Sequence, residues 1–370
     1  MKFAVERDAL LAALSHAHRI VARTDAIPIL STVRLRVAEG RVEITATSAD
    51  LVAETSCAAS VEVDGEAAIP LAPLVELMRR LPAGTAMAFA AGESGDEIAI
   101  RYRRSTASLP TLPADGFSAF SMSEGAFELD VEADHLARLI EVPVHVADAS
   151  SPWLFGLGVH MHFAESTMSL VGVATDQKRM TIVTMPATEA ARDLPPITIA
   201  VKPIGEIVKL ARDTASATLR LRVTDRLVSV SDGATTLTTK LIETQYPDYA
   251  RVVPKRSDDA ATIASAELSN ALQRTLVLAD DKDRIVRCEI ADGVLSITAR
   301  GQKSGAIHEA VEVEGGDGIR FGFNARMAVE ALSAIDADVI ELASAGPGAP
   351  IVMRAKASAE VLCLVMPLKV

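Results

Sequence analysis

The sequence predicts an α+β protein built from three tandem copies of one unit. Three stretches alternate apolar and polar residues on both sides of a short turn, namely LRVAEGRVEITATS, MHFAESTMSLVGVAT and CEIADGVLSITAR. This alternation is typical of antiparallel hairpins. Their turns, at Ala38, Ala164 and Ala291, are about 126 residues apart, which is the size of a small domain. We therefore expect a threefold repeat with mainly antiparallel sheets.

Two helical patterns accompany each hairpin. The patterns that precede the hairpins are RDALLAALSHAHRIV, ADHLARLIEVPV and SAELSNALQRTLVLA. Those that follow are PLAPLVELMRRLP, VKPIGEIVKLARD and FNARMAVEALSAID. Strand-like alternation then resumes, as in ATLRLRVTDRLVSVSDGATTLTTKLI and VIELASAGPGAPIVMRA. Each third is expected to run strand, helix, strands, helix, strands.

Polar, turn-prone segments mark the joints between the units. Each unit ends in a strand that runs into a proline, at Pro113, Pro247 and Pro367. After the last proline the apolar tail has no following domain, so we expect it to lie on the protein's own surface. The joints near residues 122–127 and 251–258 fit a linker composition. The expected domains are residues 1–122, 127–250 and 254–370.

Composition indicates a soluble protein of a reducing compartment. Hydrophobic residues make up 49% of the chain, yet no apolar run approaches the roughly 20 residues that cross a bilayer. The first ten residues mix acids and bases, unlike a secretory signal. Cys57, Cys288 and Cys363 are far apart and form no CxxC pair, which favours free thiols over disulfides or zinc. We expect a cytoplasmic protein with no membrane partner.

The formal net charge of −12 argues against a surface that is basic throughout, but it does not exclude one basic face. On a helical wheel His16, Arg19 and Arg23 lie opposite the apolar side of the first helix. Lys202 and Lys209 share a face of another. Further basic residues on predicted helices are Arg79, Arg80, Arg138, Arg274 and Arg326. A solvated face explains any single helix, whereas the recurrence favours a shared basic surface.

Motifs of catalysis and nucleotide binding are missing from the sequence. It contains no GxxxxGK[ST] loop, no GxGxxG after a predicted strand and no GxSxG elbow. His160 and His162 could share a strand face, but no third metal ligand accompanies them. Asp50, Asp176 and Asp248 lie at turns, where aspartate bonds its own backbone. We expect no enzyme, cofactor or metal; the alternative is an α+β enzyme or ligand-binding protein with a cleft between the second and third domains.

Seven segments together resemble one known family over essentially the whole length. They are MKFAVERDAL, IPILSTVRL, STASLPTLPADGF, VATDQKRM, YPDYARVVPK, FGFNARM and VMPLKV. This is the family of the beta subunits of bacterial DNA polymerase III, which are the replicative sliding clamps. The resemblance implies a head-to-tail dimeric ring of six similar domains, with helices lining a pore and sheets outside. Duplex DNA would pass through the pore, held through its phosphates without readout of bases.

The resemblance also implies partners and sites. The implied partners are duplex DNA, a second copy of the chain, the DNA polymerase III alpha subunit, the clamp loader, other polymerases and repair proteins. The residues expected to face DNA are His16, Arg19, Arg23, Arg79, Arg80, Arg138, Lys202, Lys209 and Arg274. The residues implied at the dimer joint are Arg103, Arg104 and Ala107 on one side, and Leu276, Val277 and Leu278 on the other.

In this family a short, partly hydrophobic partner peptide enters a pocket between the second and third domains. The matching positions are Leu157, Thr175, Gln177, Lys178, Arg179, Met180, Pro247, Arg251, Val252, Asn324, Met327, Leu364, Val365, Met366, Pro367 and Leu368. The chain departs from the family pattern at Gln177 and Lys178, where many relatives have Gly-His. It also departs at Ala72, where relatives often present a basic residue, and in a tail without an aromatic ring.

Overall fold

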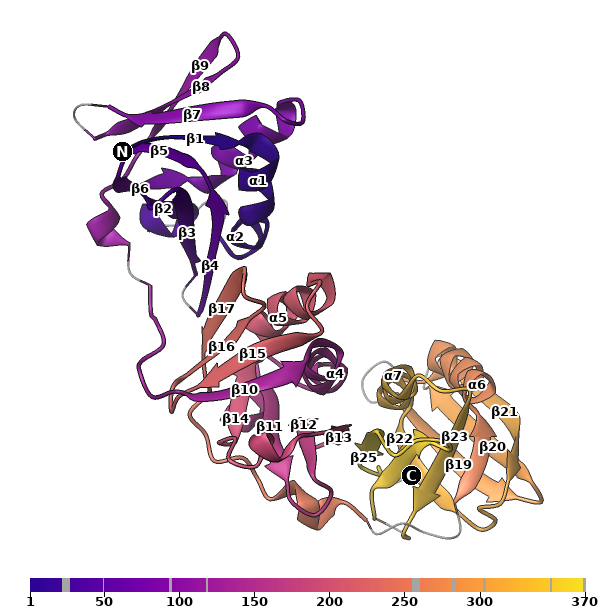
Figure 1. Ribbon diagram of the computed structural model, residues 1–370. Coiled ribbons are helices and arrows are strands. Elements are labelled where there is room, and N and C mark those ends of the chain that lie inside the picture. Colours follow the sequence, from indigo (N-terminus) through magenta and orange to yellow (C-terminus); the bar gives the residue numbers. More distant parts are fainter. Residues whose placement is uncertain are drawn as a thin grey trace. The chain divides into compact units, whose positions relative to one another are not determined.

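The computed structural model describes residues 1–21, 27–48, 50–92, 95–117, 119–254, 260–280, 284–301, 304–346 and 348–368, which contain seven α-helices and twenty-five strands (Figure 1). The chain forms two compact units. One comprises Met1–Ala137 with Gly205–Leu241, and the other Arg138–Ile204 with Ile242–Val370. None of the helices in the described ranges is long and apolar enough to cross a membrane.

The first unit contains two antiparallel sheets. The five-stranded sheet has the order β5-β1-β7-β8-β9, with bounds Ser60–Val63, Lys2–Glu6, Ala86–Ala91, Glu97–Tyr102 and Ser105–Pro110. The eight-stranded sheet has the order β10-β15-β16-β17-β4-β3-β2-β6, with bounds Phe127–Glu132, Thr218–Val223, Leu227–Ser231, Thr235–Lys240, Leu51–Ala58, Arg41–Thr47, Thr32–Ala38 and Gly65–Pro70.

The second unit is built on one twelve-stranded antiparallel sheet. Its order begins β14-β11-β12-β13-β25-β24, with bounds Ile197–Ala200, Gly158–Ala164, Ser169–Thr175, Arg179–Pro186, Val361–Val365 and Ile351–Ala355. It continues β23-β18-β21-β20-β19-β22, with bounds Val339–Ser344, Ala261–Ala264, Gly305–Glu314, Val294–Gly301, Ile285–Ala291 and Arg320–Asn324.

The helices follow the predicted order, with one difference. They are α1 Arg7–Ala13, α2 Ser15–Ile20, α3 Leu71–Arg80, α4 Ala133–Val144, α5 Val201–Asp213, α6 Ser265–Leu278 and α7 Ala325–Ile335. The first predicted helix is divided into α1 and α2 at Leu14, although the amide of Leu14 still bonds the Leu10 carbonyl at 3.0 Å. In the second unit α6 and α7 contact each other and pack on the strands of the third copy (Figure 1).

The threefold repeat predicted from the hairpins is confirmed by the strand pairing. The first copy contains the strand series β1-β7-β8-β9 and β6-β2-β3-β4. The second contains the equivalent series β10-β15-β16-β17 and β14-β11-β12-β13, and the third β18-β23-β24-β25 and β22-β19-β20-β21. Consecutive copies join edge to edge, because β17 pairs with β4 and β25 pairs with β13. These joints explain why the boundary between the two compact units falls within the second copy. The three domain limits given above stay a prediction.

Turn residues set the hairpins in two of the three copies. Glu39 and Gly40 have φ of 50° and 75°, and Asp292 and Gly293 have φ of 54° and 73°. Two successive positive φ angles match the twist of the flanking strands, and glycine adopts them without strain. The middle hairpin instead uses a longer turn that ends at Met168, with φ of 50°.

Helical spacing places apolar residues of α3 in the core of the first copy. Leu71, Leu74, Val75 and Met78 recur at three- and four-residue intervals and are all buried, which is the pattern of a helix with one face against a core. Arg79 and Arg80 end the same helix on its exposed side. The core thus orients the cationic end of α3 towards solvent.

Candidate functional site

The apolar tail of the chain forms part of the sheet. Strand β25 pairs with β13 on one side and β24 on the other, so Val361, Cys363 and Val365 are buried. Beyond the strand the Met366 amide donates to the Lys178 carbonyl at 2.8 Å. The Leu368 amide donates to the Gly322 carbonyl at 2.7 Å. The tail therefore has a defined course along the protein surface.

A tight turn between β12 and β13 faces this tail. The Asp176 carboxylate accepts from the amides of Lys178 and Arg179 at 2.9 and 2.8 Å, as predicted for a turn aspartate. The Thr175 hydroxyl donates to the Arg179 carbonyl at 2.9 Å. Gln177 has φ of 71°, a conformation that favours glycine. Side-chain hydrogen bonds thus hold the turn in shape, although its tip carries glutamine instead of glycine.

Arg179 links this turn to helix α7. Its Nε donates to Asp176 at 3.1 Å, its Nη2 donates to the His145 carbonyl at 3.1 Å, and its Nη1 pairs with Glu330. Burial alone would raise the pKa of Glu330, but hydrogen bonds from Arg179 and Arg326 outweigh burial and hold it below its ordinary value. The guanidinium is therefore engaged with the protein and holds one edge of the site in place.

The segment from Tyr246 to Val252 also borders the site and contacts two histidines of β11. The rings of His160 and Tyr246 stack with centroids 4.3 Å apart. His162 Nδ1 lies 3.0 Å from the Phe163 carbonyl and so carries the proton, which leaves Nε2 to accept from the Tyr249 hydroxyl at 2.7 Å. Burial and the neighbouring His162 lower the pKa of His160 to about 4, so this ring is neutral at pH 7.

These elements enclose a cavity of about 310 Å³, called here the apolar cavity. Its lining residues are Phe155, Thr175, Gln177, Arg179, Met180, Pro247, Asp248, Tyr249, Val252, Pro350, Leu364 and Met366. Val252 is 51% and Met366 41% exposed. Large apolar side chains at the mouth of a concave, mainly apolar site are suited to binding another hydrophobic side chain.

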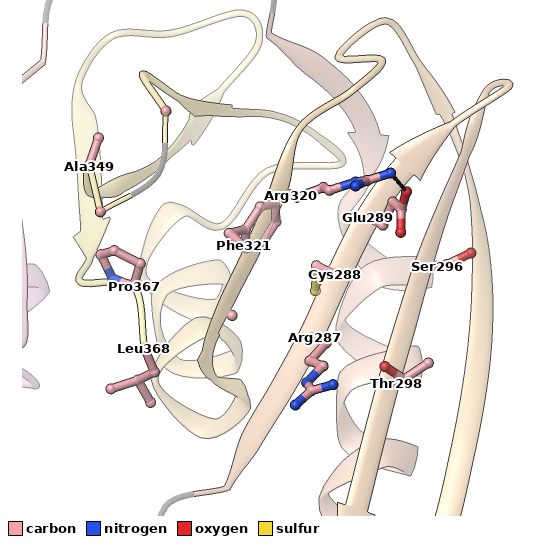
Figure 2. A pocket seen from close by; sticks show the side chains of 13 residues that line it. Arg287, Cys288, Glu289, Ser296, Thr298, Arg320, Phe321, Ala349, Pro367 and Leu368 are labelled. Carbon is pink, nitrogen blue, oxygen red and sulfur yellow. Dashed lines mark ion pairs between the residues drawn. The ribbon is translucent and has the colours of Figure 1, made fainter. Parts of the chain in front are cut away.

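Eight of the sixteen residues predicted for a peptide pocket line this cavity. They are Thr175, Gln177, Arg179, Met180, Pro247, Val252, Leu364 and Met366. Leu157, Lys178, Arg251, Asn324, Met327 and Val365 do not line it. Pro367 and Leu368 line a separate hollow (Figure 2). The side chain of Asn324 is used as the N-cap of α7, where it accepts from the amides of Arg326 and Met327.

Four lining residues were missed by the sequence reasoning. Phe155, Asp248, Tyr249 and Pro350 belong to the cavity but were not nominated. The run Trp153-Leu154-Phe155 carried a signal, because three large apolar residues in a row before a strand are unusual outside a core. Tyr249 lies two residues after the nominated Pro247, and its ring is directed by the bond to His162.

The described residues among those predicted to face DNA all lie on helices, and four of the arginines are paired with carboxylates. Arg19 bonds Glu206 at 2.6 Å, Arg79 bonds Glu76 at 3.2 Å, Arg274 bonds Glu309 at 2.6 Å, and Arg138 pairs with Glu360. Arg80, Lys202 and Lys209 are exposed and have no ion pair among the residues that the structure describes. Arg23 lies outside the described residues.

His16 was predicted to face DNA, and in the structure its side chain is largely buried. It is only 8% exposed, because its ring turns towards Arg19, whose Nη2 lies 2.7 Å from His16 Nδ1, and towards Glu206. Burial would raise the pKa of Glu206, but the neighbouring His16 and the hydrogen bond and charge of Arg19 more than offset it and keep the pKa low. Glu206 is thereby neutralised between the two exposed lysines of α5.

The residues predicted for a dimer joint lie at a turn, on a strand at the end of a sheet and at the end of a helix. Arg103 and Arg104 form the turn before β9, and Ala107 lies on β9, the end strand of its sheet. Leu276, Val277 and Leu278 end helix α6, and Val277 is 75% exposed. Residues 305–311 of β21 pair with β20 alone, since β18 pairs only further along β21, at Val313 and Glu314.

Three family models match the chain one after another. They are the N-terminal domain of the DNA polymerase III beta subunit at residues 1–121, its central domain at residues 130–248 and its C-terminal domain at residues 250–369. The chain belongs to the DNA polymerase III beta subunit family. Beta sliding clamps are similar over the full length of both chains, at 31% identity in Caulobacter vibrioides and 27% in Proteus mirabilis.

Solved structures of beta subunits share the fold. Caulobacter crescentus pol III beta superimposes with a TM-score of 0.93 at 30% identity, and the DNA polymerase III subunit beta of Pseudomonas aeruginosa with 0.94 at 23% identity; both cover 100% of each chain. The predicted fold of three tandem clamp domains is therefore confirmed, as is the function of a DNA sliding clamp and processivity factor. The beta subunit is a non-catalytic part of the polymerase. This excludes the alternative of an enzyme with a cleft between the second and third domains.

The two histidines that the sequence offered as metal ligands have structural roles. Within the described ranges no three His, Cys, Asp or Glu side chains gather to hold an ion. His160 and His162 do lie together on β11, with ring centroids 5.6 Å apart, but their partners are tyrosines and a threonine. The thiols of Cys57, Cys288 and Cys363 are free, as predicted.

Proposed function

We propose that two copies of this chain close head to tail into a ring around duplex DNA, and that the apolar cavity holds a peptide of the replicative polymerase. The proposal of a ring rests on the way the copies pair: the last strand of one copy pairs with the edge strand of the copy before it. Strand β17 of the second copy pairs with β4 of the first, and β25 of the third pairs with β13 of the second. The equivalent strands left over are β9 and the outer edge of β21.

Pairing of β9 with β21 of a second chain would satisfy both free edges. An exposed strand edge favours pairing with another chain, and a twofold arrangement uses the pair twice, which closes the assembly. By equivalence with β4 and β13, the partner strand would meet residues 305–309. The exposed Val277 at the end of α6, a helix that packs on β21, would then be covered at the same joint.

The distribution of charge supports loose, sequence-independent contact with DNA. Arg80, Lys202 and Lys209 remain available for phosphates, whereas Arg19, Arg79, Arg138 and Arg274 are already bonded to carboxylates. Affinity for DNA rises with the number of phosphates that are neutralised. A small number of unpaired cations among the residues predicted to face DNA suits a protein that is retained by encirclement rather than by tight binding. It also agrees with the net charge of −12. We place this function in the cytoplasm.

The chemistry of the apolar cavity supports a peptide with hydrophobic anchors. Met180 and Met366 provide unbranched walls that adapt to different side chains, and Tyr249, Pro247 and Leu364 complete an apolar surface. Such a pocket accepts an aliphatic or aromatic side chain from an extended segment. The polymerase alpha subunit, the clamp loader, other polymerases and repair proteins would then compete for one site.

Retention on DNA of two topologies tests the ring. The protein is loaded on nicked circular DNA by a clamp loader, and half of the sample is then cut once by a restriction enzyme. We expect the protein to stay on the circle through gel filtration and to leave the linear DNA, because only free ends allow a closed ring to slide off. Equal loss from both forms would refute encirclement.

A further inference from the structure

A second hollow adjoins the apolar cavity on the third copy. It measures about 660 Å³ and is called here the charged trough. Figure 2 shows Ala349, Pro367 and Leu368 on one side of β22, and Glu289, Ser296 and Thr298 beyond it on β19 and β20. None of these residues belongs to the lining of the apolar cavity.

The floor of the trough is the outer face of a sheet. Residues on a strand alternate between its two faces, and in β19 Val286, Cys288 and Ile290 are buried while Arg287 and Glu289 are exposed. Ser296 and Thr298 lie on the neighbouring strand β20 and also line the trough. The floor therefore offers charges and hydroxyl groups, unlike the apolar walls of the first cavity.

The cations of the trough outnumber its carboxylates. Arg320 pairs with Glu289 at 2.5 Å (Figure 2). The side chain of Arg287 is exposed and has no ion pair or hydrogen bond with any residue that the structure describes. The trough therefore carries one unpaired positive charge, which favours an anionic ligand.

The tail of the chain forms a wall of both hollows. Met366 lines the apolar cavity, and the next two residues, Pro367 and Leu368, line the charged trough. The hydrogen bonds from Met366 to Lys178 and from Leu368 to Gly322 hold this wall at both ends. The two hollows are therefore neighbours along this wall, where Met366 of one is followed directly by Pro367 of the other.

We propose that the charged trough binds acidic residues that flank the hydrophobic anchors of a partner peptide. The inference rests on the proposed peptide pocket and extends it from anchoring to selection among partners. Arg287 supplies the unpaired charge, while Ser296 and Thr298 supply hydroxyl donors to a carboxylate. Partners with acidic flanks would gain affinity over partners that have the same anchors and a neutral or basic flank.

The test uses one polymerase-derived peptide with different flanks. The peptide is made with Asp-Asp, Asn-Asn or Lys-Lys added at its N-terminus, and in a second series at its C-terminus. Binding to the full chain is measured by fluorescence anisotropy at low and at high salt. We expect Asp-Asp at one of the two ends to bind about fivefold more tightly than Asn-Asn at low salt, and this gain to shrink at high salt.

Two arginine variants test whether the higher affinity of the Asp-Asp peptide comes from the trough. In Arg287→Gln the preference for Asp-Asp should be lost while the Asn-Asn peptide binds as in the wild type. The matched control is Arg300→Gln, since Arg300 lies two residues beyond Thr298 on the same face of β20, is exposed and does not line the trough. This variant should keep the full preference.

Three results would overturn the proposal, and a fourth belongs to the pocket itself. No gain from Asp-Asp at either end, equal gains from Asp-Asp and Lys-Lys, or equal loss in both arginine variants would each exclude a specific acidic subsite. If the Asn-Asn peptide fails to bind the wild type at all, the proposal that the apolar cavity binds the peptide is wrong. The proposed acidic subsite, which depends on it, is then wrong as well.

Discussion

The ring of His162 connects a wall of the apolar cavity to the sheet beneath it. Its Nδ1 proton is directed to the Phe163 carbonyl, so Nε2 accepts the hydrogen of the Tyr249 hydroxyl at 2.7 Å. Burial and the neighbouring Asp248 raise the pKa of Tyr249 to about 12, which keeps the hydroxyl protonated as the donor at pH 7. A single hydrogen bond thus positions a ring that lines the cavity.

Removal of this hydroxyl should weaken peptide binding. In Tyr249→Phe the ring remains, but Nε2 of the half-buried His162 loses its donor, at a cost of about 1 kcal/mol. We expect a three- to tenfold rise in the Kd for a polymerase-derived peptide, corresponding to about 1 kcal/mol, measured by anisotropy. Tyr102→Phe, in a half-buried tyrosine away from the cavity, should change nothing. Unaltered affinity in Tyr249→Phe would mean that the bond does not position the wall.

Strand β25 and the tail after it form the element on which the cavity depends most. The strand joins β13 to β24, while Met366, Pro367 and Leu368 cross from one hollow to the other. The strand contributes buried residues to the sheet, whereas Met366 and Leu368 are 41% and 38% exposed. The two parts of this element can therefore be separated by mutation.

Deletion of Met366–Val370 should abolish peptide binding and leave the dimer intact. The deletion removes one wall of the apolar cavity but ends after β25, so the sheet keeps its strand pairing. Peptide binding is measured by anisotropy and mass by light scattering. A truncated chain that binds the peptide with wild-type affinity would show that the tail is not part of the site; a truncated chain that turns monomeric would mean that the tail supports the dimer.

At the scale of the whole molecule, one pairing rule joins the copies and predicts the assembly. The last strand of a copy pairs with the outer edge of the copy before it, at β17 with β4 and at β25 with β13. In the described structure β9 of the first copy is the end strand of its sheet, and residues 305–311 of β21 in the third copy pair with β20 alone. In the proposed ring a second chain would supply the partner of each of these edges, because the two ends of the repeat are complementary.

A charge at the joint should separate the two chains. In Val277→Asp a carboxylate replaces a valine that is 75% exposed in the single chain and covered in the proposed dimer, where an unpaired charge is costly. We expect a mass near 39.0 kDa instead of twice that value by light scattering, and loss of retention on circular DNA.

The control for this change is Val63→Asp. Val63 is 52% exposed on β5, the strand at the opposite end of the sheet from β9. This variant should remain dimeric. Dissociation in both variants, or in neither, would argue against a joint at the end of α6.

Residues close in sequence determined the elements and their repetition. The hairpins around Ala38, Ala164 and Ala291 and the helices that accompany them could be predicted, because period-two and helical patterns are local properties of the chain. The resemblance to the beta subunits likewise rests on contiguous segments, such as STASLPTLPADGF and FGFNARM. These are features that a short stretch of chain carries by itself.

Tertiary structure decided which side chains are available. The sequence placed His16 and Arg19 on a basic face towards DNA, but His16 is buried and Arg19 pairs with Glu206, which is distant in the chain. It also placed Pro367 and Leu368 with Met366, although the tail divides them between two hollows. Burial, pairing and cavity shape depend on atoms far apart in sequence, so a local pattern predicts the element and only the packed fold determines the surface that it presents.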